Sequence, residues 1–142
     1  AGASAMAAGT SATAADIEWV QGILGAVGTV DVVTEAQLDA VTGLSGSGPA
    51  YFFLIAEALA DAGVTAGLAR PVAERLANQT MLGAARMLLE SDESAAELRA
   101  AVTTPAGTTA AGLQMLERRG VRSALIDAVQ SAAERSRELG AR

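Results

Sequence analysis

The sequence predicts a mainly α-helical fold with a short strand–helix–strand segment at its N-terminus. Hydrophobic residues make up 51% of the 142 residues but aromatic residues only 3%. The apolar content therefore consists of small side chains, many of them alanine, which favour close-packed helices. From Glu35 onward the hydrophobic spacing is that of helices. Strand-like segments occur only before that residue.

The first 34 residues alternate between strand and helix patterns. Ala3–Ala8 is a short, weakly alternating strand candidate, and the β-branched segment Thr29–Thr34 is a second. Thr13–Val27 is expected to be a helix, with a threonine N-cap followed three residues later by Asp16. Trp19 is expected to be a core residue of this helix. Two strands with unpaired edges do not make a stable sheet, so this part resembles the tail of a larger α/β unit.

The rest of the chain is expected to be helical. Pro49 and Pro71 lie in first turns, where proline is tolerated, and Ser94 with Glu97 forms a capping-box pattern. The last helix has one apolar stripe, and its other face, which includes Arg135, carries charge. The predicted helices are Ala36–Leu44, Pro49–Ala62, Pro71–Glu90, Ser94–Val102, Thr109–Arg118 and Val121–Leu139.

Two of these helices are too apolar to be covered within one chain of this size. Val72–Leu89 leaves only a narrow polar strip, and Tyr51–Ile55 is similarly apolar. A second copy of the chain can supply the missing cover. The sequence therefore predicts an intertwined homodimer.

The composition excludes several kinds of chemistry. The chain has no cysteine and no histidine, and all ten basic residues are arginine. Thiolate or imidazole metal sites, histidine-assisted nucleophiles and lysine Schiff bases are therefore impossible within one copy, and no metal site is expected. A formal charge of −6 argues against nucleic acid as a partner. The absence of cysteine fits a reducing cytoplasm, and neither a signal peptide nor a membrane segment is expected.

Two segments that lead into helix N-termini are the candidates for ligand binding. Ser45–Pro49 precedes one helix and Thr103–Thr109 another, and each presents amides and hydroxyls that suit a carboxylate or a phosphate. The alternative is that both are ordinary capped helix starts. Glu35 could hold a substrate ammonium or could only interact with the helix dipole. A mid-helix threonine such as Thr42 usually bonds its own backbone.

Two motifs make the sequence resemble a known family. Leu38–Tyr51 (LDAVTGLSGSGPAY) and Leu98–Thr109 (LRAAVTTPAGTT) look like the C-terminal part of pyrroline-5-carboxylate reductase, in the family's order and separation. The resemblance covers essentially the whole chain. It implies an interleaved helical dimerisation domain of the 6-phosphogluconate dehydrogenase C-terminal-like type over residues 36–142. Residues 1–35 would be the tail of an N-terminal dinucleotide-binding (Rossmann) domain.

The resemblance also implies a reaction. The family reduces 1-pyrroline-5-carboxylate to L-proline with NADPH or NADH, the last step of proline biosynthesis, as a homodimer that often assembles into rings of dimers. The cofactor would be bound mainly by a domain outside this chain, so the chain alone is expected to be inactive. Two alternatives stay open: a non-catalytic helical homo-oligomerisation module, and a related imine or keto-acid reductase, against which the two motifs argue.

Individual residues receive roles from the same resemblance. Thr42 is implied as a hydrogen-bond donor near the ring nitrogen. The substrate-binding residues would be Glu35, Asp92, Thr104, Gly107, Thr108 and Thr109, the amides of the last three holding the carboxylate. The residues beside the nicotinamide would be Ser45, Ser47, Gly48 and Pro49. Ala106 departs from the family, where glycine is usual, and a side chain there is tolerable if φ is negative.

Overall fold

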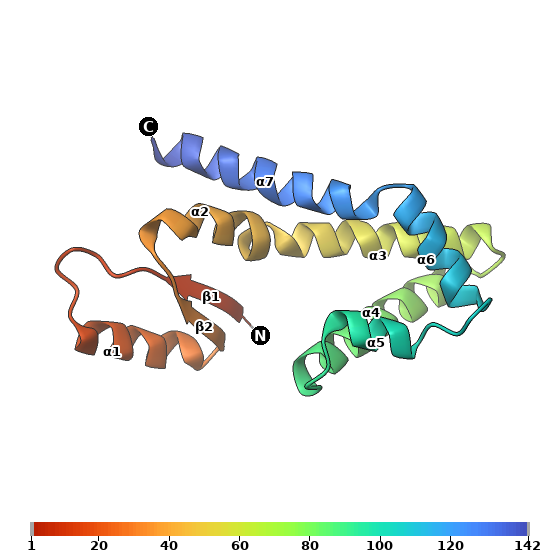
Figure 1. Ribbon diagram of the computed structural model, residues 1–142, viewed down its shortest axis with the longest axis horizontal. Coiled ribbons are helices and arrows are strands. Elements are labelled where there is room, and N and C mark those ends of the chain that lie inside the picture. The colour runs from red at the N-terminus through yellow and green to blue at the C-terminus, as the bar shows by residue number, and fades with distance from the viewer. Residues whose placement is uncertain (1, 142) are drawn as a thin grey trace. The chain divides into compact units, whose positions relative to one another are not determined.

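The computed structural model describes residues 2–141, which are mainly helical with a small sheet near the N-terminus (Figure 1). The predicted fold class is therefore confirmed. The chain divides into two compact units. The first unit comprises the residues up to Pro49 together with those from Ala124 onward, and the second unit comprises Ala50–Ser123.

The first unit begins with the predicted strand–helix–strand segment. β1 (Gly2–Met6) pairs in parallel with β2 (Gly28–Val32), and α1 (Ala14–Gly25) connects the two strands. Gly2 lies opposite Gly28, where a side chain on Gly28 would overlap the backbone of Gly2. The pairing at this end of the sheet therefore requires glycine.

The helix α1 starts at the predicted cap. The Thr13 hydroxyl donates a hydrogen bond to the Asp16 carboxylate (2.6 Å), and the Asp16 amide donates to the Thr13 hydroxyl oxygen (3.3 Å). The expectation that Trp19 is a core residue is wrong, because 69% of its surface is exposed and α1 has no buried residue. Among the described residues the sheet beside α1 has two strands, too few to cover a tryptophan.

After β2 the chain forms a helical segment with three different geometries. The predicted helix Ala36–Leu44 is present, but its last part is a π-helical turn in which the Ser47 amide donates to the Thr42 carbonyl oxygen (2.8 Å). The three parts are η1 (Glu35–Gln37), α2 (Leu38–Val41) and η2 (Thr42–Gly46).

The last helix, α7 (Val121–Gly140), packs on this π-helical turn through the part of α7 that belongs to the first unit. A side chain on Gly43 would lie 2.6 Å from the Val129 carbonyl oxygen and 3.0 Å from the Ala133 amide nitrogen. Ala133 is buried. The backbones of η2 and α7 are therefore in direct contact, which only a glycine at position 43 permits.

The second unit contains the remaining helices, whose ends lie close to those predicted. α4 begins with a proline in its first turn, and the Ser94 hydroxyl donates to the Glu97 carboxylate (2.6 Å) at the start of α5, as the capping box predicts. These helices are α3 (Gly48–Thr65), α4 (Arg70–Glu90), α5 (Ala95–Ala101) and α6 (Thr108–Arg118).

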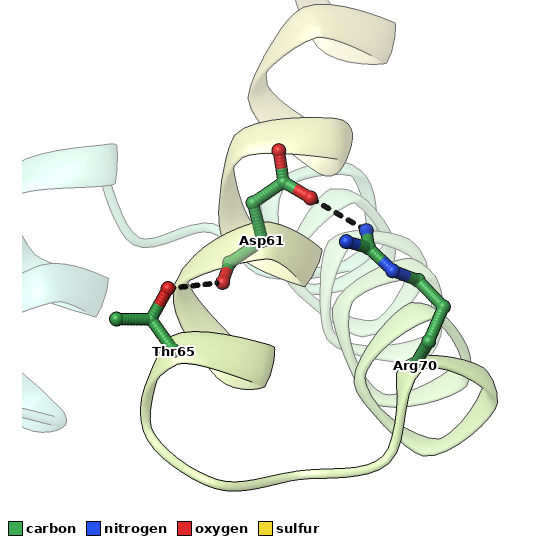
Figure 2. Close-up of polar contacts among 3 residues, drawn as sticks. All are labelled: Asp61, Thr65 and Arg70. Atoms are coloured by element: carbon green, nitrogen blue, oxygen red, sulfur yellow. Dashed lines mark hydrogen bonds and ion pairs between the residues drawn. The ribbon is translucent and has the colours of Figure 1, made fainter.

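The corner between α3 and α4 is fixed by close packing and by one ion pair. A side chain on Gly63 would lie 3.0 Å from the Ala73 Cβ atom, so the two helices approach closely. Arg70 donates to the Asp61 carboxylate (2.5 Å), and the Thr65 hydroxyl donates to the Asp61 carbonyl oxygen (2.9 Å) (Figure 2). The bond to Asp61 raises the pKa of Arg70.

Large apolar side chains are exposed on the described part of the chain. The buried hydrophobic residues there are all alanine, namely Ala60, Ala73, Ala77 and Ala133. By contrast, 72% of Phe53 and 82% of Leu89 are exposed. One copy of the chain therefore does not enclose a core of large side chains. No helix among the described residues has both the length and the apolar composition needed to cross a membrane.

Candidate functional site

The candidate residues fall into two groups, one in each unit. The first group surrounds η2, and the second lies at the α4–α5 connection and at the start of α6. The first group contains Glu35, Thr42, Ser45, Ser47, Gly48 and Pro49. The second group contains Asp92, Thr104, Gly107, Thr108 and Thr109.

The hydroxyls of η2 bond to the preceding helical turn. Thr42 donates to the Leu38 carbonyl oxygen (3.0 Å), and Ser45 donates to the Val41 carbonyl oxygen (3.1 Å). The Ser47 amide is already used in the π-helical bond to Thr42. The expectation that Ser45–Pro49 is a loop with unpaired amides is therefore wrong for Ser47, because the π-helical turn continues almost directly into α3.

A hollow of about 270 Å³ lies between η2 and α7 within the first unit. It joins Thr42 and Ser47 to polar side chains of α7. The sequence pattern places Arg135 on the polar face of this helix but does not connect it to Thr42, because nothing in the order of residues shows which turn of α7 faces η2. The lining residues are Thr42, Ser47, Ala132, Arg135, Ser136 and Leu139.

Glu35 is exposed at the first position of η1. The N-cap Thr34 donates through its amide (2.8 Å) and its hydroxyl (2.9 Å) to the side-chain oxygen of Gln37. The start of η1 is therefore stabilised by Thr34 and Gln37, and the Glu35 carboxylate is not part of this cap. It is accessible to a ligand.

A tight turn precedes α6. The Gly107 amide donates to the Thr104 carbonyl oxygen (3.0 Å), with Pro105 and Ala106 between them. Ala106 has φ +58°, the left-handed value that the third position of a type II turn requires. The condition that φ be negative is therefore not met, and the alanine side chain is held in an unfavourable backbone conformation.

Gly107 is the N-cap of α6 and lies against the Thr104 side chain. A Cβ atom at position 107 would overlap the Thr104 hydroxyl oxygen, so the close approach requires glycine. Gly107 also has no side chain to accept a hydrogen bond from the helix amides, and the first helical bond that reaches it comes from Ala111 (3.2 Å). The amides from Thr108 to Ala110 are thus the donors that a helix start offers to an outside acceptor. The expectation that the Gly107 amide also holds the carboxylate is not met, because this amide already donates to the Thr104 carbonyl oxygen.

These amides make the start of α6 suitable for an anion. Thr104, Thr108 and Thr109 are all exposed, so a ligand can reach the amides and the threonine hydroxyls together. The positive end of the helix dipole adds to the attraction of a carboxylate. The structure therefore supports this segment as a candidate carboxylate site.

Asp92 is exposed in the bend between α4 and α5. The neighbouring Glu93 amide donates to the Ser91 hydroxyl oxygen (3.1 Å). Within the described residues no hydrogen bond joins Asp92 to the start of α6. Among the same residues no cluster of histidine, cysteine, aspartate or glutamate side chains is placed to hold a metal ion.

Comparisons with known proteins show what the chain is similar to. A family model described as pyrroline-5-carboxylate reductase dimerisation matches residues 35–139. The chain is 52% identical to the pyrroline-5-carboxylate reductase of Mycobacterium tuberculosis over 98% of the chain and 53% of that protein. It is 50% identical to the Synechocystis protein of the same name over 99% of the chain and 52% of that protein. The chain spans about half the length of the curated relatives it matches.

Solved structures agree with this similarity. The structure of a pyrroline-5-carboxylate reductase from Coxiella burnetii matches with a TM-score of 0.92 and 42% identity, over 95% of this chain and 50% of that one. A Plasmodium falciparum pyrroline carboxylate reductase with NADP bound matches with a TM-score of 0.86 and 33% identity, over 96% and 53%. The dimerisation-domain fold implied by the two sequence motifs is thereby confirmed.

Proposed function

This chain belongs to the pyrroline-5-carboxylate reductase dimerisation family, and from that premise we propose that it is the dimerising, substrate-binding half of such a reductase. The proposed reaction converts the ring C=N bond of 1-pyrroline-5-carboxylate to the C–N bond of L-proline, in the cytoplasm. The observation that carries the proposal is the exposed start of α6, which is ready to bind a carboxylate within the segment that the family model matches.

The substrate carboxylate binds at the start of α6 in this proposal. The amides of Thr108 and Thr109 donate to the carboxylate, and the tight turn formed by Thr104 and Gly107 holds them in place. Hydrogen bonds to a charged acceptor are stronger than those to a neutral one, which suits a small substrate with one carboxylate.

The ring nitrogen gains electron density when hydride reaches the adjacent carbon, so it needs a proton or a hydrogen-bond donor. We assign this role to Thr42. Its hydroxyl donates to the Leu38 carbonyl oxygen in the structure, so it must rotate away from that bond to donate to the nitrogen. Glu35 is the carboxylate that would favour a protonated, positively charged imine. Asp92 is included as a further acidic residue near the substrate.

NADPH or NADH, when bound, supplies the hydride. The described residues include two parallel strands joined by one helix, and the connection from β1 to α1 is not a glycine-rich turn of the kind that binds a pyrophosphate. We therefore propose that Ser45, Ser47, Gly48 and Pro49 contact only the nicotinamide end. Similarity to a reductase solved with NADP bound supports the use of a nicotinamide cofactor; the roles of the four residues rest on the family resemblance.

The domain organisation follows from the same reasoning. We propose that residues 1–35 belong to a dinucleotide-binding domain and that residues 36–142 form the helical domain. The βαβ geometry of β1, α1 and β2 supports the first part, and the family match, which begins at residue 35, supports the second. A second copy of the chain is the proposed partner, and a ring of dimers is the further assembly that the family resemblance implies.

A complementation assay tests the proposed function. The chain is mixed with a separately produced N-terminal half of a relative, and NADPH oxidation is measured with 1-pyrroline-5-carboxylate. We expect activity only when both parts are present. A folded mixture without activity would favour a non-catalytic oligomerisation module instead.

A proline substitution tests the carboxylate site within that assay. Thr108→Pro removes one amide donor at the first position of α6, where proline is tolerated, and Gly107 already has the extended backbone that precedes proline (φ −78°, ψ 171°). Loss of a charge-assisted hydrogen bond is expected to raise KM for the substrate by about tenfold or more. Ala95→Pro, at the first position of α5, is the matched control and should leave KM unchanged. Equal KM values for both variants would contradict the assignment.

A further inference from the structure

We propose that η2 is a positioning element for the proposed reaction: its π-helical turn, packed against α7 at Gly43, brings Thr42 and Ser47 to one face of the helix. The inference rests on the proposed function, in which Thr42 donates to the ring nitrogen and Ser47 contacts the nicotinamide. It adds Gly43, and the part of α7 that contacts it, to the residues on which the reaction depends.

The π-helical turn determines which way Thr42 and Ser47 face. Successive residues of an α-helix are rotated by about 100°, so residues five apart lie about 140° apart around the helix axis. In η2 the Ser47 amide donates to the Thr42 carbonyl oxygen (2.8 Å), a bond that places residues five apart on the same side of the helix. Both residues line the hollow beside α7. An α-helix through this segment would turn Ser47 away from Thr42.

Gly43 lies within the π-helical turn and joins it to α7. A side chain at this position would lie 2.6 Å from the Val129 carbonyl oxygen and 3.0 Å from the Ala133 amide nitrogen, which are backbone atoms of α7. Gly43 is buried, and Ala133 is only 8% exposed. Backbone atoms within a packed helix do not move aside separately, so a side chain at position 43 must displace the turn as a whole. The contact therefore fixes the position of the neighbouring Thr42.

The proposed reaction is sensitive to such a displacement. The donor to the ring nitrogen acts while hydride arrives from the nicotinamide, so the residues that contact these two groups must be aligned with each other. The proposed carboxylate site at the start of α6 does not include η2. A shift of η2 should therefore change the rate of hydride transfer more than the binding of the substrate. Single π-helical turns occur frequently at functional sites, which agrees with a role in alignment.

NMR of the chain tests the geometry of the turn. We expect a nuclear Overhauser effect between the Thr42 methyl and the Ser47 β protons, and a scalar coupling through the hydrogen bond from the Ser47 amide to the Thr42 carbonyl. Coupling from Ser47 to the Gly43 carbonyl would indicate an α-helical turn and overturn the inference. Gly43→Ala should weaken both signals. Gly63→Ala, which fills another close contact between helices (3.0 Å from the Ala73 Cβ atom), should leave them unchanged.

The complementation assay tests the effect on the reaction. With the N-terminal half in excess, Gly43→Ala should lower kcat by about tenfold to 100-fold and leave KM for 1-pyrroline-5-carboxylate nearly unchanged. Gly63→Ala should leave kcat unchanged at a temperature where circular dichroism shows both variants folded. Because Gly43 acts through Thr42, adding Gly43→Ala to Thr42→Val should lower kcat little further. Ala133→Val crowds the same contact from α7, and it replaces Gly43→Ala in these measurements if that variant does not fold.

Failure of the inference and failure of the proposed function give different results. An unchanged kcat for Gly43→Ala, an equal loss of kcat in Gly63→Ala, or additive effects in the double variant would overturn the inference and leave the proposed function intact. A folded but inactive mixture of the unsubstituted parts would refute the proposed function, and the positioning role with it.

Discussion

Ala106 has the least favourable backbone conformation for its side chain. Its φ of +58° is needed for the turn that presents the start of α6, and a residue with a side chain pays about 1–2 kcal/mol there. Ala106→Gly removes this strain but also increases the conformational entropy of the unfolded chain, which offsets part of the gain in stability. We expect the free energy of unfolding to rise by about 0.5–1 kcal/mol, measured by denaturant titration.

An alanine in the following helix is the matched control for this substitution. Ala111 lies within α6, where glycine costs about 1 kcal/mol relative to alanine. Ala111→Gly should therefore lower the free energy of unfolding while Ala106→Gly raises it. Two changes of the same sign would contradict the strained conformation of Ala106.

Gly43 matters because it has no side chain. Any side chain at this position meets the Val129 carbonyl oxygen, and moving α7 away would also open the hollow beside Thr42. Gly43→Ala should lower the free energy of unfolding by about 1–3 kcal/mol. Gly22→Ala, in α1 with open space around it, should raise the free energy by up to about 1 kcal/mol. Denaturant titration of both variants checks the contrast.

The helices α1 and α5 each begin with a capping box, in which a carboxylate accepts hydrogen bonds at the helix start. The hydroxyl and amide of Thr13 hold the pKa of Asp16 below its ordinary value, and those of Ser94 do the same for Glu97. A carboxyl group whose pKa is lower in the folded state than in the unfolded state stabilises the fold at pH values above its ordinary pKa, which is near 4. That contribution is lost as the pH falls through the lowered value.

The pH dependence of the two caps can be measured residue by residue. We expect NMR titration of the Asp16 and Glu97 carboxyls to give midpoints below those of free side chains. Thr13→Val and Ser94→Ala should each return the matching midpoint toward its ordinary value and leave the other unchanged. Ordinary midpoints in the unsubstituted chain would argue against both caps.

Elements were predictable from the sequence where local chemistry decides the outcome. The caps at Thr13 and Ser94 mark the starts of two helices, and the apolar spacing indicates how far each helix extends. The helix ends predicted in this way lie close to those in the structure. The π-helical turn at Thr42 was not predictable, because it depends on how closely Gly43 approaches α7. The exposure of Trp19 was not predictable either, since a periodic pattern shows which face is apolar and not whether anything covers it.

The candidate site likewise contains some residues that the sequence indicates and others that only the fold brings together. The two motifs indicate most of both groups of candidate residues, since each motif is a continuous segment whose amides and hydroxyls can be named. Glu35 and Asp92 lie outside the motifs, and their roles come from the family resemblance alone. The place of Arg135 in the hollow follows only from the fold, because its neighbours Thr42 and Ser47 come from a distant part of the sequence. Contacts between distant segments are not visible in residue order.

The distribution of apolar surface over the second unit predicts that the chain is a dimer in solution. A groove of about 460 Å³ between α3 and α4 is lined only by apolar side chains, among them Phe52, Met81 and Leu88. Since the buried hydrophobic residues of the described chain are all alanine, a partner that fills this groove would bury more large side chains than the chain buries alone. A second copy offers the same surface, as a symmetric interface requires.

Sedimentation measures the prediction. We expect a mass of twice 14.2 kDa at micromolar concentration, and a thermal midpoint that rises with protein concentration because only the folded chain associates. Leu88→Glu places a charge in the groove and should shift the mass toward that of one chain. Trp19→Glu changes an apolar residue that is even more exposed than Leu88 (69% against 52%) but lies outside the segment that matches the dimerisation family, and it should leave the dimer intact. A monomer for the unsubstituted chain would show that the apolar groove is covered in some other way.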